Sequence, residues 1–152
     1  MYWSYLSREQ VDQALSSLES DLVEVKIGHS KEPYIALDRD IEQEVPPLPK
    51  VIVLPKYDSL MLSLRDKSRF MNMAYYKRIF PKIPVGMVKP TVLVDGFVAA
   101  TWRRVAGKRA TSIEVRAFKK TSSTDKKAVE QQFFEYCKYS GVEASVKWVR
   151  GA

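Results

Sequence analysis

A two-residue turn between two β-rich runs is the sequence feature that most constrains this fold. The turn is Asp95-Gly96, a dipeptide that favours a type I′ turn because both central residues must adopt positive φ. It joins residues 90–94 to residues 97–102, and both runs are rich in β-branched or aromatic side chains. Pro90 marks the start, since proline cannot donate to a central ladder. The pattern predicts a β-hairpin.

The hairpin is apolar on both of its faces. The two-residue turn sets the register, and the opposed pairs are Val94 with Phe97, Leu93 with Val98 and Val92 with Ala99. A ribbon of this kind needs cover on both sides. We therefore expect the hairpin to lie inside a sheet or a small barrel. Beyond it the apolar run stops at Trp102-Arg103-Arg104, an aromatic side chain followed by two cations.

Composition excludes several classes of protein. The 152 residues are 45% apolar, which is enough for a packed core, and no run approaches the roughly 18 apolar residues of a membrane span. The start of the chain lacks the pattern of a secretory signal, so we expect a cytoplasmic protein. One cysteine, Cys137, and one histidine, His29, cannot build a disulfide framework or a Cys/His metal site. We expect no metal and no other cofactor.

Charge is distributed unevenly along the chain. Residues 1–49 contain 4 Lys/Arg and 10 Asp/Glu, whereas residues 50–152 contain 21 Lys/Arg and 8 Asp/Glu. An asymmetry of this size suggests a polyanionic partner for the later part of the chain. A basic surface that merely keeps the protein soluble is the alternative, and charge by itself does not choose between them.

The first 44 residues predict a helix followed by a β-hairpin. Ser7 and Gln10 have the spacing of a capping box at the start of an amphipathic helix. Two short strands follow, near residues 22–27 and 34–37. A helix and a hairpin are the last elements of a winged helix, so we interpret residues 1–44 as a partial winged-helix-like segment. Apolar residues near the terminus, including Tyr2 and Trp3, suggest docking either on the rest of this chain or on a missing segment.

Residues 45–152 predict a β-rich domain. The prolines of segment 45–49 stiffen the chain where the charge changes sign, and we place the boundary there. Strands are expected near residues 51–54, 112–118 and 142–149 in addition to the hairpin, with helices over residues 72–80 and from residue 125 onward. The predicted fold is α+β: a helix-wing remnant followed by a small antiparallel β-barrel-like domain with two helices.

Three motifs in order resemble a known family. The first is Leu54-Pro55-Lys56-Tyr57-Asp58 with Leu60, the second is Asp66-x-x-Arg69, and the third runs from Pro90 through Asp95-Gly96 to Thr101-Trp102-Arg103. They resemble the C-terminal part of the winged-helix DNA-binding family that includes the AlkZ-like DNA glycosylases. The match spans about residues 50–118 and, more loosely, the helix-wing piece. The resemblance implies tandem winged helices closed by a β-rich domain and used on DNA; some members excise alkylated or crosslinked bases.

The catalytic motif of that family has a weak counterpart here. Its glycosylases carry a Gln-apolar-Gln or Gln-apolar-Asp motif far upstream, and Gln10-Val11-Asp12 matches that spelling. We interpret this match as coincidence, because Gln10 has a capping role. Asp58 is expected to cap a turn, Asp66 to pair with Arg69, and Asp95 with Gly96 to form the hairpin turn. None of these carboxylates is expected to be catalytic.

A cationic segment is the strongest functional signal. Between residues 103 and 120, seven cations accompany a single carboxylate, Glu114. With Trp102 as a candidate for base stacking, the predicted DNA-binding set is Trp102, Arg103, Arg104, Lys108, Arg109, Arg116, Lys119 and Lys120. Its apolar strand neighbours favour a core position for Trp102 over base stacking.

Three functional hypotheses follow. The first is a non-catalytic DNA-binding module whose partner is the phosphate backbone of double-stranded DNA. The second is a protein-interaction module that docks on itself or on a missing N-terminal winged-helix partner. The third is an alkylated-DNA glycosylase acting through Gln10 and Asp12. The residues favour the first, and enzymatic activity stays open.

Overall fold

The chain divides into two compact units. The computed structural model describes residues 6–27, 33–64, 66–82, 86–106, 111–139, 141 and 144–149. The first unit is Met1–Pro47 and the second is Leu48–Ala152, and we call them the N-terminal unit and the C-terminal unit. The division falls in the proline-rich segment. Each unit is described by itself below.

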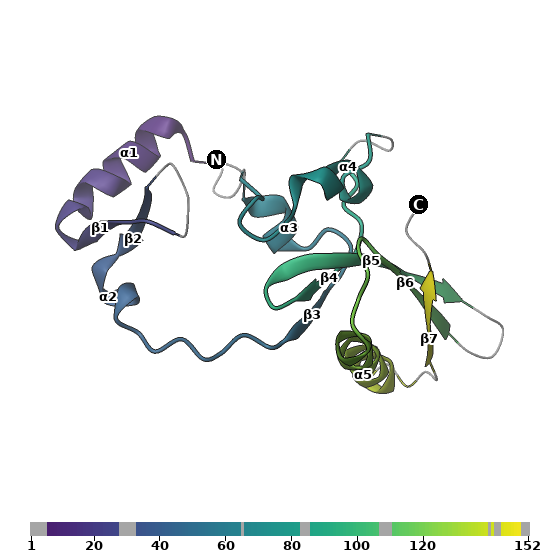
Figure 1. Ribbon diagram of the computed structural model, residues 1–152. Coiled ribbons are helices and arrows are strands. Elements are labelled where there is room, and N and C mark those ends of the chain that lie inside the picture. The colour runs from purple at the N-terminus through teal and green to yellow at the C-terminus, as the bar shows by residue number, and fades with distance from the viewer. Residues whose placement is uncertain are drawn as a thin grey trace. The chain divides into compact units, whose positions relative to one another are not determined.

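The N-terminal unit is a helix followed by a β-hairpin (Figure 1). Its elements are α1 (Arg8–Ser17), η1 (Glu19–Asp21), β1 (Leu22–Val25), β2 (Tyr34–Leu37) and α2 (Asp38–Ile41). The predicted capping box is confirmed, because Ser7 Oγ accepts from the Gln10 N–H at 3.2 Å and Gln10 Oε1 accepts from the Ser7 N–H at 2.8 Å. None of the described residues of this unit is buried. Tyr2, Trp3 and His29 lie outside the described residues.

The C-terminal unit is a five-stranded sheet with helices on both faces (Figure 1). Its elements are β3 (Val51–Leu54), α3 (Ser59–Ser63), η2 (Met73–Tyr75), α4 (Tyr76–Ile79), β4 (Thr91–Val94), β5 (Phe97–Ala106), β6 (Thr111–Ala117), α5 (Ser123–Tyr139) and β7 (Ala144–Val149). The α+β class is confirmed.

The sheet is open and mixed, which corrects the barrel-like antiparallel prediction. The strand order is β3-β4-β5-β6-β7, and among the described residues the edge strands β3 and β7 do not pair with each other. β7 is parallel to β6 because α5 carries the chain back across one face of the sheet before the last strand begins. A crossover of this kind adds a strand at the edge and does not close the sheet.

The Asp95-Gly96 hairpin is confirmed, with one correction to its register. Asp95 has φ 49° and Gly96 has φ 78°, as a type I′ turn requires. The predicted pairs of Val94 with Phe97 and Leu93 with Val98 form, but Val92 pairs with Ala100. A β-bulge between Val92 and Leu93 shifts the ladder by one residue. A bulge leaves one residue unpaired, and period-2 reasoning cannot locate it.

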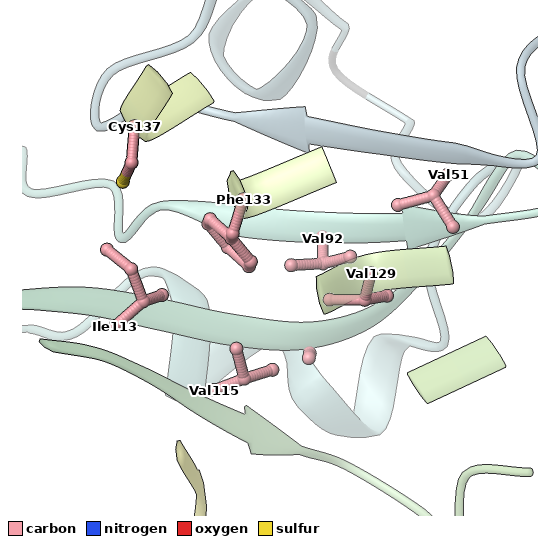
Figure 2. Close-up of a cluster of buried hydrophobic side chains, with 8 residues drawn as sticks. Val51, Val92, Ile113, Val115, Val129, Phe133 and Cys137 are labelled. Carbon is pink, nitrogen blue, oxygen red and sulfur yellow. The ribbon is translucent and has the colours of Figure 1, made fainter. Parts of the chain in front are cut away.

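Two apolar clusters lie on opposite faces of the sheet. The cluster under α5 contains Val51, Val92, Ala100, Ile113, Val115, Val129, Phe133 and Cys137, most of which Figure 2 labels. The cluster under α3 and α4 contains Leu54, Met61, Phe70, Met71, Ile79, Val88, Leu93 and Val98. Val92 and Leu93 are neighbours in the chain and belong to different clusters. The hairpin is therefore covered on both faces, as its sequence predicts.

Short polar caps explain why the helical layer contains more elements than predicted. The sequence predicts two helices in this unit, but α3, α4 and α5 form together with η2. Asp58 Oδ1 accepts from the Leu60 N–H at 2.9 Å and starts α3, and Asn72 Oδ1 accepts from the Ala74 N–H at 2.9 Å and starts η2. Each cap begins a helix too short to show apolar periodicity in the sequence.

Replacement of Gly96 tests the turn. A Cβ at this position would meet nothing within 4 Å, so the penalty of Gly96→Ala comes from its φ of 78°. We expect Gly96→Ala to lower the free energy of unfolding by about 1–2 kcal/mol in urea denaturation. Gly96→Asn is the matched control and should lose less, because asparagine tolerates the left-handed region better. Equal losses for both variants would contradict this assignment.

Candidate nucleic-acid interface

Strand alternation separates the two arginines that follow Trp102. Arg104 pairs with Ile113, which is buried in the cluster under α5. Arg103 pairs with Glu114 and lies on the opposite face, because successive side chains of a strand alternate between faces. The predicted cationic set is therefore split between two sides of the sheet, and Arg103 and Arg104 do not form one patch.

The face opposite α5 is only partly covered by the helical layer. α3 and α4 pack over β3, β4 and the start of β5 (Figure 1). Further along, exposed cations come from the chain before β4 and from β5, β6 and β7: Lys89, Arg103, Arg116 and Lys147. Together with Glu114, we call these residues the open basic face. A groove of about 400 Å³ is lined by Lys89, Arg103, Glu114 and Arg116, with Thr101 among its other lining residues.

Glu114 lies among the cations of the open basic face. Arg103 Nε and Nη2 both contact Glu114 Oε2, each at 2.5 Å. The hydrogen bond from Arg103 lowers the pKa of Glu114, and the charges of Arg103, Arg116 and Lys147 lower it further. The same carboxylate raises the pKa of Arg103. Among the described residues, the charged side chains that act on Glu114 are therefore all positive. The electrostatic field at this position favours an anion.

Lys119 and Lys120 line a second groove. This groove measures about 650 Å³ and lies beside the hairpin turn, where Asp95, Phe97 and Tyr75 also line it. Phe97 is 54% exposed, whereas the Tyr75 ring stacks on Phe118 with centroids 4.3 Å apart. Arg78 of α4 lies over the Phe118 ring at 5.8 Å. Two predicted cations thus contribute to a surface other than the open basic face.

Trp102 packs into the core. Its Nε1 donates to the Leu54 carbonyl at 3.0 Å, and its ring meets Phe133 edge-to-face at 5.2 Å. The indole is partly buried against the cluster under α5. These contacts orient the ring toward α5 and away from the side on which Arg103 lies.

The carboxylates singled out from the sequence have structural partners. Asp58 caps α3, and Asp95 lies in the hairpin turn. Asp66 accepts from the Ser68 N–H at 2.9 Å and from Ser68 Oγ at 2.7 Å, and these bonds lower its pKa, with a smaller contribution from the charge of Arg69. The sequence predicts Arg69 as the partner of Asp66, and the first partner is Ser68.

Gln10 and Asp12 lie on α1 in the N-terminal unit. Gln10 belongs to the capping box, and Asp12 Oδ2 is 3.8 Å from Arg8 Nε in an exposed pair. Lys108 and Arg109 lie outside the described residues, so their part in the interface stays a prediction.

Sequence reasoning missed three cations. Lys147 alternates with Val146 and Trp148, a period-2 signal that could have placed it on the face opposite α5. Lys89 and Arg78 carried no such signal, because tertiary packing places Lys89 in the groove beside Arg103 and Arg78 over the Phe118 ring. Over the described residues no group of three or more His, Cys, Asp and Glu is arranged to hold a metal ion. No helix in the described part of the chain has the length and apolarity to cross a bilayer.

Replacing Trp102 tests its core position. Trp102→Phe removes the donor to the Leu54 carbonyl, so the free energy of unfolding should fall by about 1–3 kcal/mol in urea denaturation. Tyr139→Phe is the control, because Tyr139 is 94% exposed and its change should leave stability unaltered. If Trp102→Phe is as stable as the original chain, the assignment of Trp102 to the core is wrong.

Comparison with known proteins shows which family this chain belongs to. The family model described as DNA glycosylase AlkZ-like matches residues 1–139, so the relationship extends beyond residues 50–118 and includes the N-terminal unit. A solved structure, the Streptomyces sahachiroi DNA glycosylase AlkZ, has the same fold, with 19% identity and a TM-score of 0.66. The similarity covers 95% of this chain and 38% of that protein. No curated protein matches. The chain belongs to the AlkZ-like DNA glycosylase family.

Proposed function

We propose that this chain is a non-catalytic DNA-binding module of a DNA-repair protein. The C-terminal domain, residues 45–152, holds the phosphate backbone of double-stranded DNA against the open basic face. Residues 1–44 form a winged-helix-like segment. Family membership supports a role on DNA, and the relative whose fold this chain shares is named as a DNA glycosylase.

The observation that carries the proposal is the convergence of four cations on one exposed face. Arg103, Arg116 and Lys147 lie on three neighbouring strands, and Lys89 precedes β4. Neighbouring strands are about 4.8 Å apart, so these side chains span roughly 10 Å across the sheet. Measured along the axis of a duplex, that distance corresponds to about three phosphates of one strand. Several phosphate contacts can therefore form together.

Backbone contacts of this kind predict a characteristic binding behaviour. Lysine and arginine side chains that neutralise phosphates release counterions, so affinity falls steeply with salt and depends little on sequence. Because the Trp102 indole packs in the core, we do not assign it a base-stacking role. Lys119 and Lys120 provide a second cationic position beside the hairpin turn.

Charge reversal at Arg116 tests the proposal. Arg116→Glu removes one phosphate contact and adds repulsion, so duplex affinity should fall by about tenfold or more at low salt in fluorescence anisotropy. The slope of log affinity against log salt should become shallower by about one. Lys138→Glu is the matched control, because Lys138 is exposed on α5 and changes net charge equally. Equal losses in the two variants, or binding indifferent to salt, would contradict the proposal.

Glycosylase activity of this chain by itself is a second candidate, favoured by the family to which it belongs. It requires Gln10 and Asp12 to reach the target base. Gln10 is bonded to Ser7 at the N-cap of α1 and Asp12 is paired with Arg8, which favours the non-catalytic interpretation. Release of an alkylated base from duplex DNA, lost on Asp12→Ala, would support the glycosylase over the binding module.

Self-association is a third candidate, favoured by the surface of the N-terminal unit. Its exposed apolar side chains include Leu18 at 41%, Ile35 at 58% and Ile41 at 49%. Residues 1–49 are also net acidic, whereas residues 50–152 are net basic, so two copies are complementary in charge. Sedimentation at increasing concentration separates the cases, and a strict monomer removes this candidate.

A further inference from the structure

Glu114 is an anion built into a surface that otherwise attracts anions. It stands on β6, opposite Arg103 of β5 and Lys147 of β7 in the strand register, and Arg116 follows two residues later on the same face. Its side chain is 22% exposed, and that of Arg103 is 68% exposed. The Glu114 carboxylate is thus less exposed than the Arg103 side chain beside it. A phosphate oxygen that approaches the groove would compete with this carboxylate for Arg103 Nε and Nη2.

We infer that Glu114 acts as an internal competitor of the DNA backbone, holding Arg103 when DNA is absent and setting the affinity and salt range in which the open basic face binds. This inference rests on the proposed DNA-binding function and adds a residue that regulates it. Glu114 is a positioning residue, because it acts on DNA through Arg103.

The arrangement suits regulation better than stabilisation. Because Arg103 is 68% exposed, water and salt screen its pair with Glu114, and the pair contributes little to folding. Its effect on binding is larger, since Arg103 Nε and Nη2 are both directed at Glu114 Oε2. While that contact lasts, the guanidinium cannot direct the same two groups at a phosphate. A duplex must therefore displace Glu114 before Arg103 contributes fully.

The neighbouring cations make the displacement feasible. When Arg103 turns to a phosphate, Glu114 keeps the favourable charges of Arg116 and Lys147, both of which act on it in the free protein. The carboxylate is then not left without a counter-charge. Arg103 then exchanges one oxygen anion for another, and Glu114 gives up the hydrogen bond that lowers its pKa most.

Glu114→Gln tests the inference by removing the charge and keeping the shape. In fluorescence anisotropy with a duplex at low salt, we expect this variant to bind about threefold to tenfold more tightly than the original chain. The slope of log affinity against log salt should become more negative by about one, because Arg103 gains a phosphate contact. Glu135→Gln is the matched control, since Glu135 is exposed on α5 and its loss changes net charge equally.

The remaining outcomes separate this inference from the proposed function. If the original chain binds DNA with a steep salt dependence and Glu114→Gln binds no more tightly, the inference fails and the DNA-binding function stands. Equal gains from Glu114→Gln and Glu135→Gln also overturn it, because net charge then explains both. In an Arg103→Gln background, Glu114→Gln should gain less DNA affinity than in the original chain, and an undiminished gain counts against the inference.

Glu114→Thr is a second variant for use if Glu114→Gln folds poorly, because a β-branched residue suits a strand. Thermal melting checks that each variant is folded.

Discussion

The β4–β5 hairpin is covered by side chains on both faces, and the rest of the C-terminal unit depends on that double burial. Val92 packs under α5 and Leu93 packs under α3 and α4, although they are adjacent in the chain. One ribbon therefore fixes two layers of helices relative to one sheet. The Asp95-Gly96 turn sets where the ribbon reverses, and the bulge after Val92 sets which residues of β5 face each layer.

The open basic face follows from this packing. The helical layer under which Leu93 lies ends before the far half of β5, and β6 and β7 extend the sheet beyond it. Alternation along β5 then turns Trp102 toward α5 and Arg103 toward the uncovered side. A side chain that anchors the core and a cation that faces solvent are consecutive residues of one strand. The core thereby holds the cationic surface in a fixed orientation.

The open basic face contains one carboxylate, Glu114, among its cations. Glu114 occupies the centre of the cationic group, where the hydrogen bond from Arg103 and the surrounding positive charges lower its pKa. The proposed DNA contact and the proposed competition by Glu114 are two consequences of the same field. In the N-terminal unit, by contrast, none of the described residues is buried, so its stability depends on local capping and hairpin contacts.

The sequence by itself determined the local elements: the capping box of α1, the Asp95-Gly96 hairpin, and the presence of β6 and α5. These depend on neighbouring residues and short periodicities, which a sequence displays directly. Tertiary structure decided the open sheet, the parallel β7 and the assembly of Lys89 and Lys147 with Arg103 and Arg116. Those features depend on which strands pair across long separations and where a bulge shifts the register, and nearby residues do not encode either choice.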